Sequence, residues 1–280
     1  MTDTTLGVLH PGEMGSSVAA AAKSRGTRVV WAADGRSDAS RARAEAEQLE
    51  DVGDLARLLA VSDVVCAVCP PHAALDQAHA VARLAYEGVY IDANAVAPET
   101  SREIGRVVEA AGATFVDGGI IGPPARRAGS TRLYLSGERA ESVAALFRES
   151  ALDAITLDGP AGAASALKVC FAAYTKGSTA LLTAIRALAI HEGVDDALVG
   201  EWSTSLPDIS ARSEGGARGV ARKAWRFAGE MEEIAATFAS AGLPDGFHRS
   251  AADLYERLAC YKDSKEPPTL DEIARVLLGD

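Results

Sequence analysis

The first 160 residues alternate short apolar runs with amphipathic segments, a pattern typical of a doubly wound parallel sheet with helices on both faces. We expect strands at residues 5–9, 28–33, 63–69, 89–92, 114–117, 132–136 and 154–157. We expect helices at residues 13–25, 39–48, 54–59, 73–85, 99–111 and 140–149. The run 63–69 contains Val-Val-Cys-Ala-Val, and such an unbroken apolar stretch suits a strand buried on both faces.

Strand signals stop after residue 158, and the remainder has the pattern of helices. A loop with Gly159, Pro160 and Gly162 leads into roughly 29 residues without proline, which predict a helix on the order of 43 Å long. Further helices are expected at residues 195–203, 220–241, 246–257 and 269–278. The chain therefore divides into an α/β domain, 1–160, and an all-helical domain, 161–280, which we assign to substrate binding and dimerisation.

The long helix joins the two domains. Lys168, Lys176 and Arg186 argue against a membrane span, which needs about 20 apolar residues. The helix is rich in alanine and apolar on more faces than one α/β domain can cover. We therefore expect a homodimer in which each helical domain packs against its mate.

Composition and charge limit the kinds of binding partner that we expect. The net charge is −11 and neither half carries a basic patch, which excludes nucleic acid and anionic membranes as expected partners. The N-terminus enters a strand-like run without an apolar signal region, so we expect a cytoplasmic protein. Cys66 and Cys69 lie three apart in an extended run and face opposite sides, so that we predict neither a metal site nor a disulfide there.

The glycine-containing sequence at 7–15, Gly-Val-Leu-His-Pro-Gly-Glu-Met-Gly, lies between the first strand and the first helix. A Rossmann-type domain binds pyrophosphate there, on the free N–H groups of the helix N-terminus. His10 occupies the first glycine position of the usual G-x-G-x-x-G, and histidine tolerates a left-handed backbone. Gly12 would let the backbone approach the phosphates, and Gly15 would let the helix pack on the strand. An ordinary glycine-rich turn is the alternative, but the flanking strand and helix favour dinucleotide binding.

The end of the second strand bears on the choice between NADP and NAD. Arg36, Ser37 and Arg41 form a cationic, hydroxyl-bearing cluster suited to the 2′-phosphate of NADP. Asp34 is the argument for NAD, because an acid near this place accepts hydrogen bonds from the ribose. We prefer NADP; three solvated loop residues are the alternative reading.

Three further strand ends point to the same edge, where ligands of such sheets bind. Cys69 and Pro70 follow the third strand and are expected to line the cofactor site. Asn94 is a neutral donor and acceptor suited to the nicotinamide ribose or carboxamide. The loop 117–124 is expected to present main-chain N–H groups to a substrate, although its two prolines supply none. Each of these segments alone could be an ordinary turn.

Lys168 is the candidate proton donor. On a 3.6-residue repeat it shares a face with Ala164, Ala172, Thr175 and Thr179, which solvate an ammonium group poorly. Desolvation of this kind lowers a lysine pKa towards the range useful for proton transfer. The chain has six lysines against 22 arginines, which favours a selected lysine here. The alternative is a lysine whose stem covers apolar surface while its charge reaches water.

Five motifs come in the order found in the β-hydroxyacid dehydrogenases, which the first 190 residues resemble. They are G-x-x-x-x-G-x-M-G, Asp-x-Asn…Pro, Asp-Gly-Gly…Gly, Ala-Gly-Ser-Thr and Gly-x-x-Gly…Lys168. This superfamily includes 6-phosphogluconate and hydroxyisobutyrate dehydrogenases and, more distantly, imine reductases. The 10–15 loop and the segment from Trp225 to Glu233 resemble a subfamily whose C-terminal domain is functionally undefined. The resemblance implies that pyrophosphate is held by His10, Pro11, Gly12, Glu13 and Met14, that Asn94 serves the nicotinamide and Gly122 the substrate, and that Lys168 moves the proton.

The chain departs from the family at the substrate site. Phe171 and Ala172 stand where the family usually has asparagines, and Ile121 replaces its serine. Tyr174 and Lys176 could supply the missing polar groups, or could be structural. The substrate is therefore not predicted to be a simple hydroxyacid.

These observations lead to an NADP-dependent oxidoreductase that moves hydride to or from a carbonyl or hydroxyl carbon of a small molecule. An imine reductase is one alternative, favoured by the missing asparagines but not by Lys168. A non-catalytic protein that senses the redox state of the dinucleotide is another.

Overall fold

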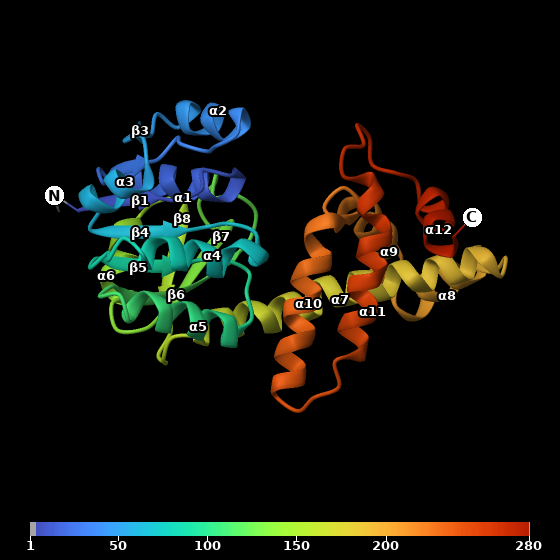
Figure 1. The fold of residues 1–280 in the computed structure, drawn as a ribbon. Coiled ribbons are helices and arrows are strands. Elements are labelled where there is room, and N and C mark those ends of the chain that lie inside the picture. Colours follow the sequence, from blue (N-terminus) through green and yellow to red (C-terminus); the bar gives the residue numbers. More distant parts are fainter. Residues whose placement is uncertain (1–3, 280) are drawn as a thin grey trace. The chain divides into compact units, whose positions relative to one another are not determined.

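The computed structural model describes residues 4–279 and divides the chain into two compact units, Met1–Lys168 and Val169–Asp280. The N-terminal unit contains one sheet with the strand order β3-β2-β1-β4-β5-β6-β7-β8. Figure 1 shows β1, β4, β5 and β6 from top to bottom in this order. The predicted Rossmann-type arrangement is confirmed. The boundary between the units falls inside the long helix, after Lys168 rather than at residue 160.

The strands of the N-terminal unit are β1 (Thr5–Val8), β2 (Arg28–Trp31), β3 (Glu50–Asp51), β4 (Val64–Ala67), β5 (Val89–Asp92), β6 (Thr114–Ile121), β7 (Thr131–Ser136) and β8 (Leu152–Thr156). Its helices are α1 (Glu13–Lys23), α2 (Asp38–Ala46), α3 (Leu55–Val61), α4 (Pro71–Ala82), α5 (Pro98–Glu109) and α6 (Ala140–Ala144), and the short η1 (Ala145–Phe147) follows α6. The short strand β3 is an addition to the predicted elements.

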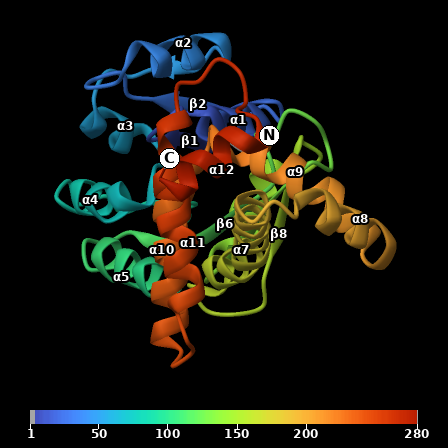
Figure 2. The same ribbon diagram turned by 90° about the vertical axis from the view of Figure 1, so that its right-hand side faces the viewer.

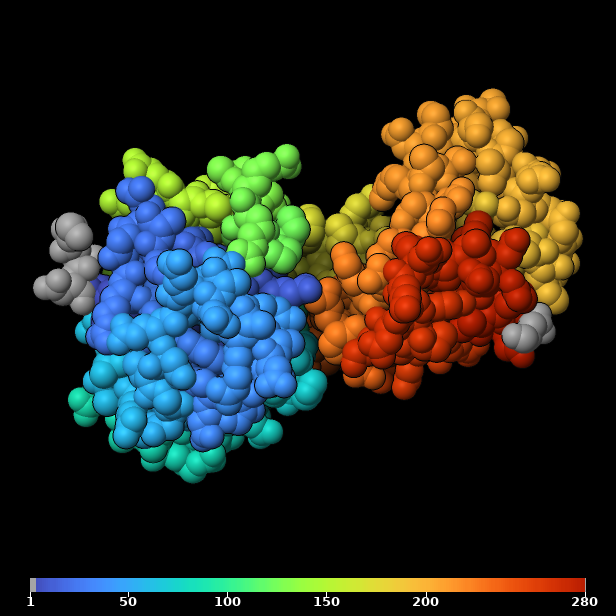
Figure 3. Space-filling model, turned by 90° about the horizontal axis from the view of Figure 1, so that it is seen from above, coloured from blue at the N-terminus to red at the C-terminus, as the bar shows by residue number. Residues whose placement is uncertain are grey.

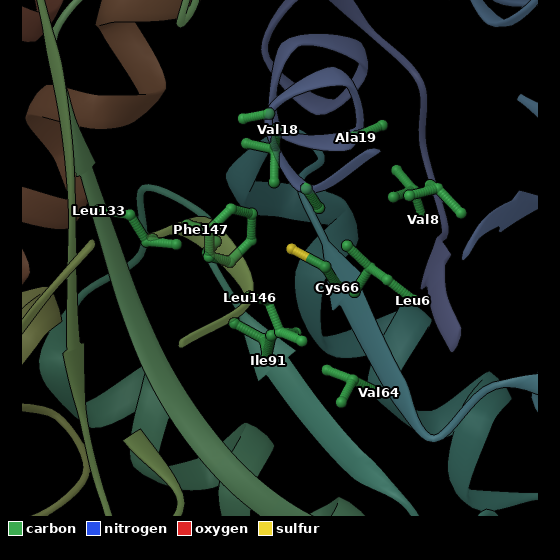
Figure 4. Packing of buried hydrophobic residues seen from close by; sticks show 14 of the residues in the cluster. Leu6, Val8, Val18, Ala19, Val64, Cys66, Ile91, Leu133, Leu146 and Phe147 are labelled. Carbon is green, nitrogen blue, oxygen red and sulfur yellow. The ribbon is translucent and has the colours of Figure 1, made fainter. Parts of the chain in front are cut away.

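Alternating side chains of the buried strands enter two different cores, as expected for a sheet covered on both faces. Cys66 of β4 packs with Val18 of α1 and Phe147 of η1, and Figure 4 shows these side chains converging. Val65, one residue earlier, packs in the other cluster, which includes Ile104 of α5. The two cores fix the register of the central strands.

Strand β6 extends to Ile121, which corrects the expectation of a ligand-binding loop over 117–124. It pairs with β7 in antiparallel fashion, from Asp117 opposite Ser136 to Ile121 opposite Arg132, whereas the other neighbouring strands pair in parallel. The backbone of 117–121 therefore belongs to the sheet. Gly118 is favoured by close packing, because a Cβ there would make a tight contact of 3.0 Å with the carbonyl oxygen of Asp92.

A buried carboxylate connects β6 to three other elements. Asp117 is 0% exposed and accepts five hydrogen bonds. Its donors are the Ser101 hydroxyl at 2.8 Å, the Ser136 hydroxyl at 3.0 Å, the Gly162 and Ser165 N–H groups at 3.0 Å each, and the Ser165 hydroxyl at 2.5 Å. Because these donors lie on α5, β7 and the start of the long helix, one side chain positions all three against β6.

The long helix α7 spans Ala163–His191, as the sequence predicted. The other helices of the C-terminal unit are α8 (Asp195–Ser205), α9 (Pro207–Ala221), α10 (Ala224–Ser240), α11 (Gly246–Arg257), η2 (Leu258–Tyr261) and α12 (Leu270–Leu278). Helices α10 and α11 pack side by side in Figure 1, and overlap in the turned view of Figure 2, around the buried side chains of Met231 and Tyr255. The single helix expected over 220–241 is instead the end of α9 followed by α10.

Helix α7 keeps exposed leucines within this unit, with Leu181 47% and Leu188 58% exposed. The homodimer expected from its apolar faces stays a prediction. Among residues 4–279, no helix has the length and apolar character that a membrane crossing requires.

Removing the Asp117 carboxylate tests its role as the common partner. Asp117→Ala leaves buried hydroxyl and N–H donors unsatisfied, so we expect the free energy of unfolding of the N-terminal unit to fall by about 3–5 kcal/mol. Hydrogen exchange across residues 4–168 under increasing denaturant measures this unit separately. The exposed Asp153→Asn on β8 is the control and should change stability by less than ~0.5 kcal/mol. A loss below ~1 kcal/mol in Asp117→Ala would contradict the assignment.

Candidate active site

The three glycines of the 7–15 loop have different physical roles. A Cβ at Gly7 would lie 2.5 Å from the Ser62 hydroxyl oxygen, and one at Gly15 would lie 2.0 Å from the His10 carbonyl oxygen. Gly7 and Gly15 are therefore required by packing. Gly12, the N-cap of α1, has no atom within 4 Å of such a Cβ. The space beside Gly12 lies at the N-terminus of α1, where unpaired N–H groups and the helix dipole favour an anion.

His10 lies in this loop without a left-handed backbone, which corrects one expectation. In the described part of the chain, the non-glycine residues with positive φ are Gln48, Ala85 and Glu149. Burial and the charge of Arg36 lower the pKa of His10 to about 4, so that the imidazole is neutral near pH 7. Its Nδ1 atom is buried and has no hydrogen-bond partner among residues 4–279.

The charge of Arg36 acts on His10 in this loop and on Cys69 after β4. Burial lowers the pKa of Arg36, and its Nε atom is a second buried group without a partner among the described residues. Ser37 caps α2 by accepting a hydrogen bond from the Ser40 N–H at 3.3 Å. Arg41 donates from Nη2 to the Ala33 carbonyl at 2.7 Å and thereby ties α2 to the end of β2.

Asn94 is held between two neighbours at the ends of β4 and β5. Its Oδ1 accepts from the Cys69 N–H at 2.5 Å, and its Nδ2 donates to Asp92 Oδ1. The Cys69 donor settles the orientation of the amide, because only the oxygen can accept that bond. Burial raises the pKa of the Cys69 thiol to about 12, so that a neutral thiol lies beside the amide, with Pro70 following.

Lys168 lies beside this edge because β6 has a glycine opposite α7. A Cβ at Gly119 would lie 2.6 Å from the Ala164 carbonyl oxygen and 3.3 Å from Lys168 Cβ. The first turns of α7 therefore approach β6 more closely than any larger residue would permit. The charge of Lys168 acts on Asp92, the partner of Asn94. The N-terminal unit thus places Lys168 near the hydrogen-bonded pair of Asp92 and Asn94.

Of the predicted substrate residues, two belong to the N-terminal unit. Ile121 is 7% exposed at the end of β6. Gly122 has φ +127°, and a Cβ there would lie 2.4 Å from the Ser130 carbonyl oxygen. The 122–130 segment, green in Figure 3, lies at the surface of this unit. The Ala125 N–H donates to the Ser17 hydroxyl at 3.0 Å, which attaches the segment to α1.

The other predicted substrate residues belong to the C-terminal unit. Phe171 and Tyr174 are exposed, 47% and 65% respectively, whereas Ala172 is buried in that unit's core. Lys176 forms an ion pair with Glu230 and lies 4.9 Å from the centroid of the Phe227 ring. Lys176 is therefore already engaged within its own unit, and its role towards a substrate stays a proposal.

Two residues of the N-terminal unit were not singled out from the sequence: Asp92, which orients Asn94, and Gly119, which admits α7. An acid that ends a buried strand was the available signal for Asp92. The open backbone at Gly12 and the unpartnered atoms of His10 and Arg36 fit a dinucleotide with anionic phosphates. Of the described residues, the ones that could hold it are the five of the loop, His10, Pro11, Gly12, Glu13 and Met14, together with Arg36, Ser37, Arg41, Cys69, Pro70 and Asn94.

The strand order, the glycine loop and the amide at the carboxyl edge define a dinucleotide-binding α/β domain of the dehydrogenase type. Residues 5–156, more than half of the chain, match the NAD binding domain of 6-phosphogluconate dehydrogenase, and the chain belongs to this family. Residues 189–258 match a domain of unknown function, DUF1932. The resemblance found in the sequence is confirmed, and the protein is an NAD(P)-dependent oxidoreductase.

Individual proteins show the same likeness. An uncharacterised 28.5 kDa protein of Methanothermus fervidus, named for the 7S RNA 5′ region, is 27% identical over 194 residues, covering 69% of this chain and 74% of that protein. The 3-hydroxyisobutyrate dehydrogenase of Mycobacterium tuberculosis, solved with L-serine, has a TM-score of 0.74 at 16% identity, and 99% of each chain is covered. A reductive aminase of Aspergillus terreus, solved with NADPH and ethyl levulinate, has a TM-score of 0.58 at 18% identity, with 97% and 98% covered. At these identities the two structures show a shared fold.

Alanine substitutions at Gly15 and Gly12 distinguish a role in packing from a role in cofactor binding. Gly15→Ala forces a clash with the His10 carbonyl, and we expect it to lower the free energy of unfolding by about 1–3 kcal/mol. Gly12→Ala meets open space, so its stability should equal that of the wild type while its affinity for NADPH falls about tenfold or more, ~1.4 kcal/mol. Thermal unfolding and fluorescence titration measure the two effects. Unchanged affinity in Gly12→Ala would place the phosphates elsewhere.

Proposed function

We propose that this protein is an NADP-dependent oxidoreductase that reduces a carbonyl carbon of a small molecule, or oxidises the corresponding alcohol. The observation that carries the proposal is the approach of Lys168 to β6 at Gly119, on the same edge as Asn94. A bound nicotinamide supplies or accepts the hydride. Asn94 orients the cofactor through the amide N–H and oxygen lone pair that its contacts with Asp92 and Cys69 leave available.

Lys168 acts on the oxygen of the substrate. When hydride reaches the carbonyl carbon, the π electron pair moves to the oxygen, and the Lys168 ammonium donates a proton to it. The resulting neutral amine regains its proton from water. In the reverse direction the neutral amine takes the alcohol proton as hydride leaves the carbon.

Imine reduction is the second candidate, favoured by Phe171 and Ala172 at the positions where the resemblance leads us to expect asparagines. Without amides at these positions, the site would offer a substrate carboxylate less support. The fold shared with a reductive aminase adds to this possibility. An iminium substrate already carries positive charge, however, and a cationic Lys168 beside it would be repulsive.

Cofactor preference tests the role of Arg36. Because its guanidinium can pair with the 2′-phosphate, NADPH should bind more tightly than NADH by about 1–3 kcal/mol. Arg36→Ala should abolish that difference, whereas Arg57→Ala on the exposed face of α3 should keep it. Fluorescence titration of the wild type and the two variants with both cofactors measures the six affinities. Equal wild-type affinities, or a preference that survives Arg36→Ala, would contradict the assignment of NADP.

Substitution of Lys168 tests the chemistry. Lys168→Ala should lower kcat for carbonyl reduction roughly 10²–10⁴-fold with nearly unchanged NADPH affinity, since a general acid is lost. Lys168→Arg should be nearly as damaging, because guanidinium scarcely releases its proton near neutral pH. Steady-state kinetics on a panel of carbonyls and cyclic imines measures this, with the exposed Lys265→Ala as control.

Two results would change the assignment. Carbonyl reduction by Lys168→Ala within about threefold of the wild type would make the lysine structural, because loss of a general acid costs far more. A gain of activity on cyclic imines in the same variant would favour the imine reductase.

A further inference from the structure

Two aspartates lie on neighbouring strands of the sheet, Asp92 at the end of β5 and Asp117 within β6, and their surroundings differ. Asp92 of β5 lies directly opposite Asp117 of β6 in the parallel register, and both are 0% exposed. Asp117 accepts five hydrogen bonds, which occupy both of its oxygens. Asp92 Oδ1 accepts a hydrogen bond from the Asn94 amide, whereas its Oδ2 is a buried atom without a hydrogen-bond partner among residues 4–279. A buried acid with a purely structural role would have hydrogen bonds to both of its oxygens.

The charges around Asp92 come from several elements. Burial and the charge of Asp117 raise the pKa of Asp92 to about 7, while the Asn94 hydrogen bond and the Lys168 charge lower it less. The remaining titratable neighbours are Cys66, Cys69 and Tyr90, whose pKa values are themselves raised by burial and by Asp92. Cys66 and Cys69 titrate at about 12, so they stay neutral, and the Tyr90 phenol stays neutral as well. Of Asp92, Cys66, Cys69 and Tyr90, therefore, Asp92 is the one whose charge changes near pH 7.

We propose that Asp92 is a positioning residue of the reaction, which holds the Asn94 amide in place and, when ionised, keeps the Lys168 ammonium protonated. This inference rests on the proposed function. The coupling with Lys168 is reciprocal, because a lysine charge that favours the carboxylate is favoured by it to the same extent. Asp92 does not touch the substrate; it acts through Asn94, whose amide it receives at Oδ1, and through the charge of Lys168.

Asp92→Asn tests the proposal because it removes the charge with little change of shape. In the pH profile of carbonyl reduction, the wild-type kcat should change with an apparent pKa within about one unit of 7. This pH-dependent change of kcat should be absent in the variant. The variant's kcat should be about 10- to 100-fold lower, the range seen when a partner that orients a ligand-binding residue is lost. Asp153→Asn on β8, exposed and distant in the strand order, is the matched control and should keep the wild-type profile.

A second readout needs no turnover. The pKa of Asp92 is higher in the folded chain than in the unfolded chain, so the folded protein binds more protons and loses stability as pH rises from about 4 through 7. The unfolding midpoint of Asp92→Asn should therefore rise relative to the wild type between pH 5 and pH 8. Should the variant not fold, Asn94→Ala provides the test: loss of its hydrogen bond should move the wild-type pH transition in stability to higher pH.

The outcomes separate this inference from the proposed function. An active wild type whose pH profile and midpoint difference are unchanged in Asp92→Asn would overturn the positioning role and leave the oxidoreductase assignment standing. A wild type that transfers hydride to no carbonyl and no imine would overturn both, even if its stability follows the expected pH dependence. Loss of the pH-dependent change of kcat together with the pH-dependent midpoint difference would support both.

Discussion

The buried Asp117 carboxylate is the contact on which the arrangement of the N-terminal unit depends. A carboxylate removed from water has to be surrounded by donors, and the donors available are on α5, β7 and the first turn of α7. Gly162, with φ +99°, turns the chain so that its own N–H and that of Ser165 reach the same oxygen. The start of α7 is thereby fixed over β6, and Gly119 lets it come close enough to bring Lys168 to the edge of the sheet.

The two neighbouring acids, Asp117 and Asp92, have different roles: we assign Asp117 to the fold and Asp92 to the proposed chemistry. Asp117 has its hydrogen bonds satisfied and joins elements, whereas Asp92 has one partner and lies beside Asn94 and Lys168. Each acid also acts on the other, since the charge of Asp117 makes ionisation of Asp92 harder. The fold places two carboxyls opposite each other but supplies hydrogen bonds to both oxygens of Asp117 only, and the pKa of Asp92 is raised as a result.

The family relationship rests on the N-terminal unit, where the dinucleotide is expected to bind, while the C-terminal unit matches a domain of unknown function. The chemistry that a family shares is set by the cofactor edge, and the substrate is set by side chains that differ between members. Phe171 is an exposed aromatic group at a position where the resemblance predicts an asparagine that contacts the substrate.

Local patterns in the sequence determined most of the strands and helices, including the long helix, and the glycine loop between β1 and α1, because each depends on residues close together in the chain. Strand β6 extends to Ile121 because it pairs with the antiparallel strand β7, and no local pattern in β6 predicts that pairing. Helix α9 contains Gly215 and Gly216, which disfavour a helix, and it forms because Ala217 and Ala221 are buried in the core of its unit. The state of Asp92 likewise follows from burial and from Asp117, 25 positions along the chain. Only the tertiary structure decided it, since desolvation and charge coupling depend on distance in space.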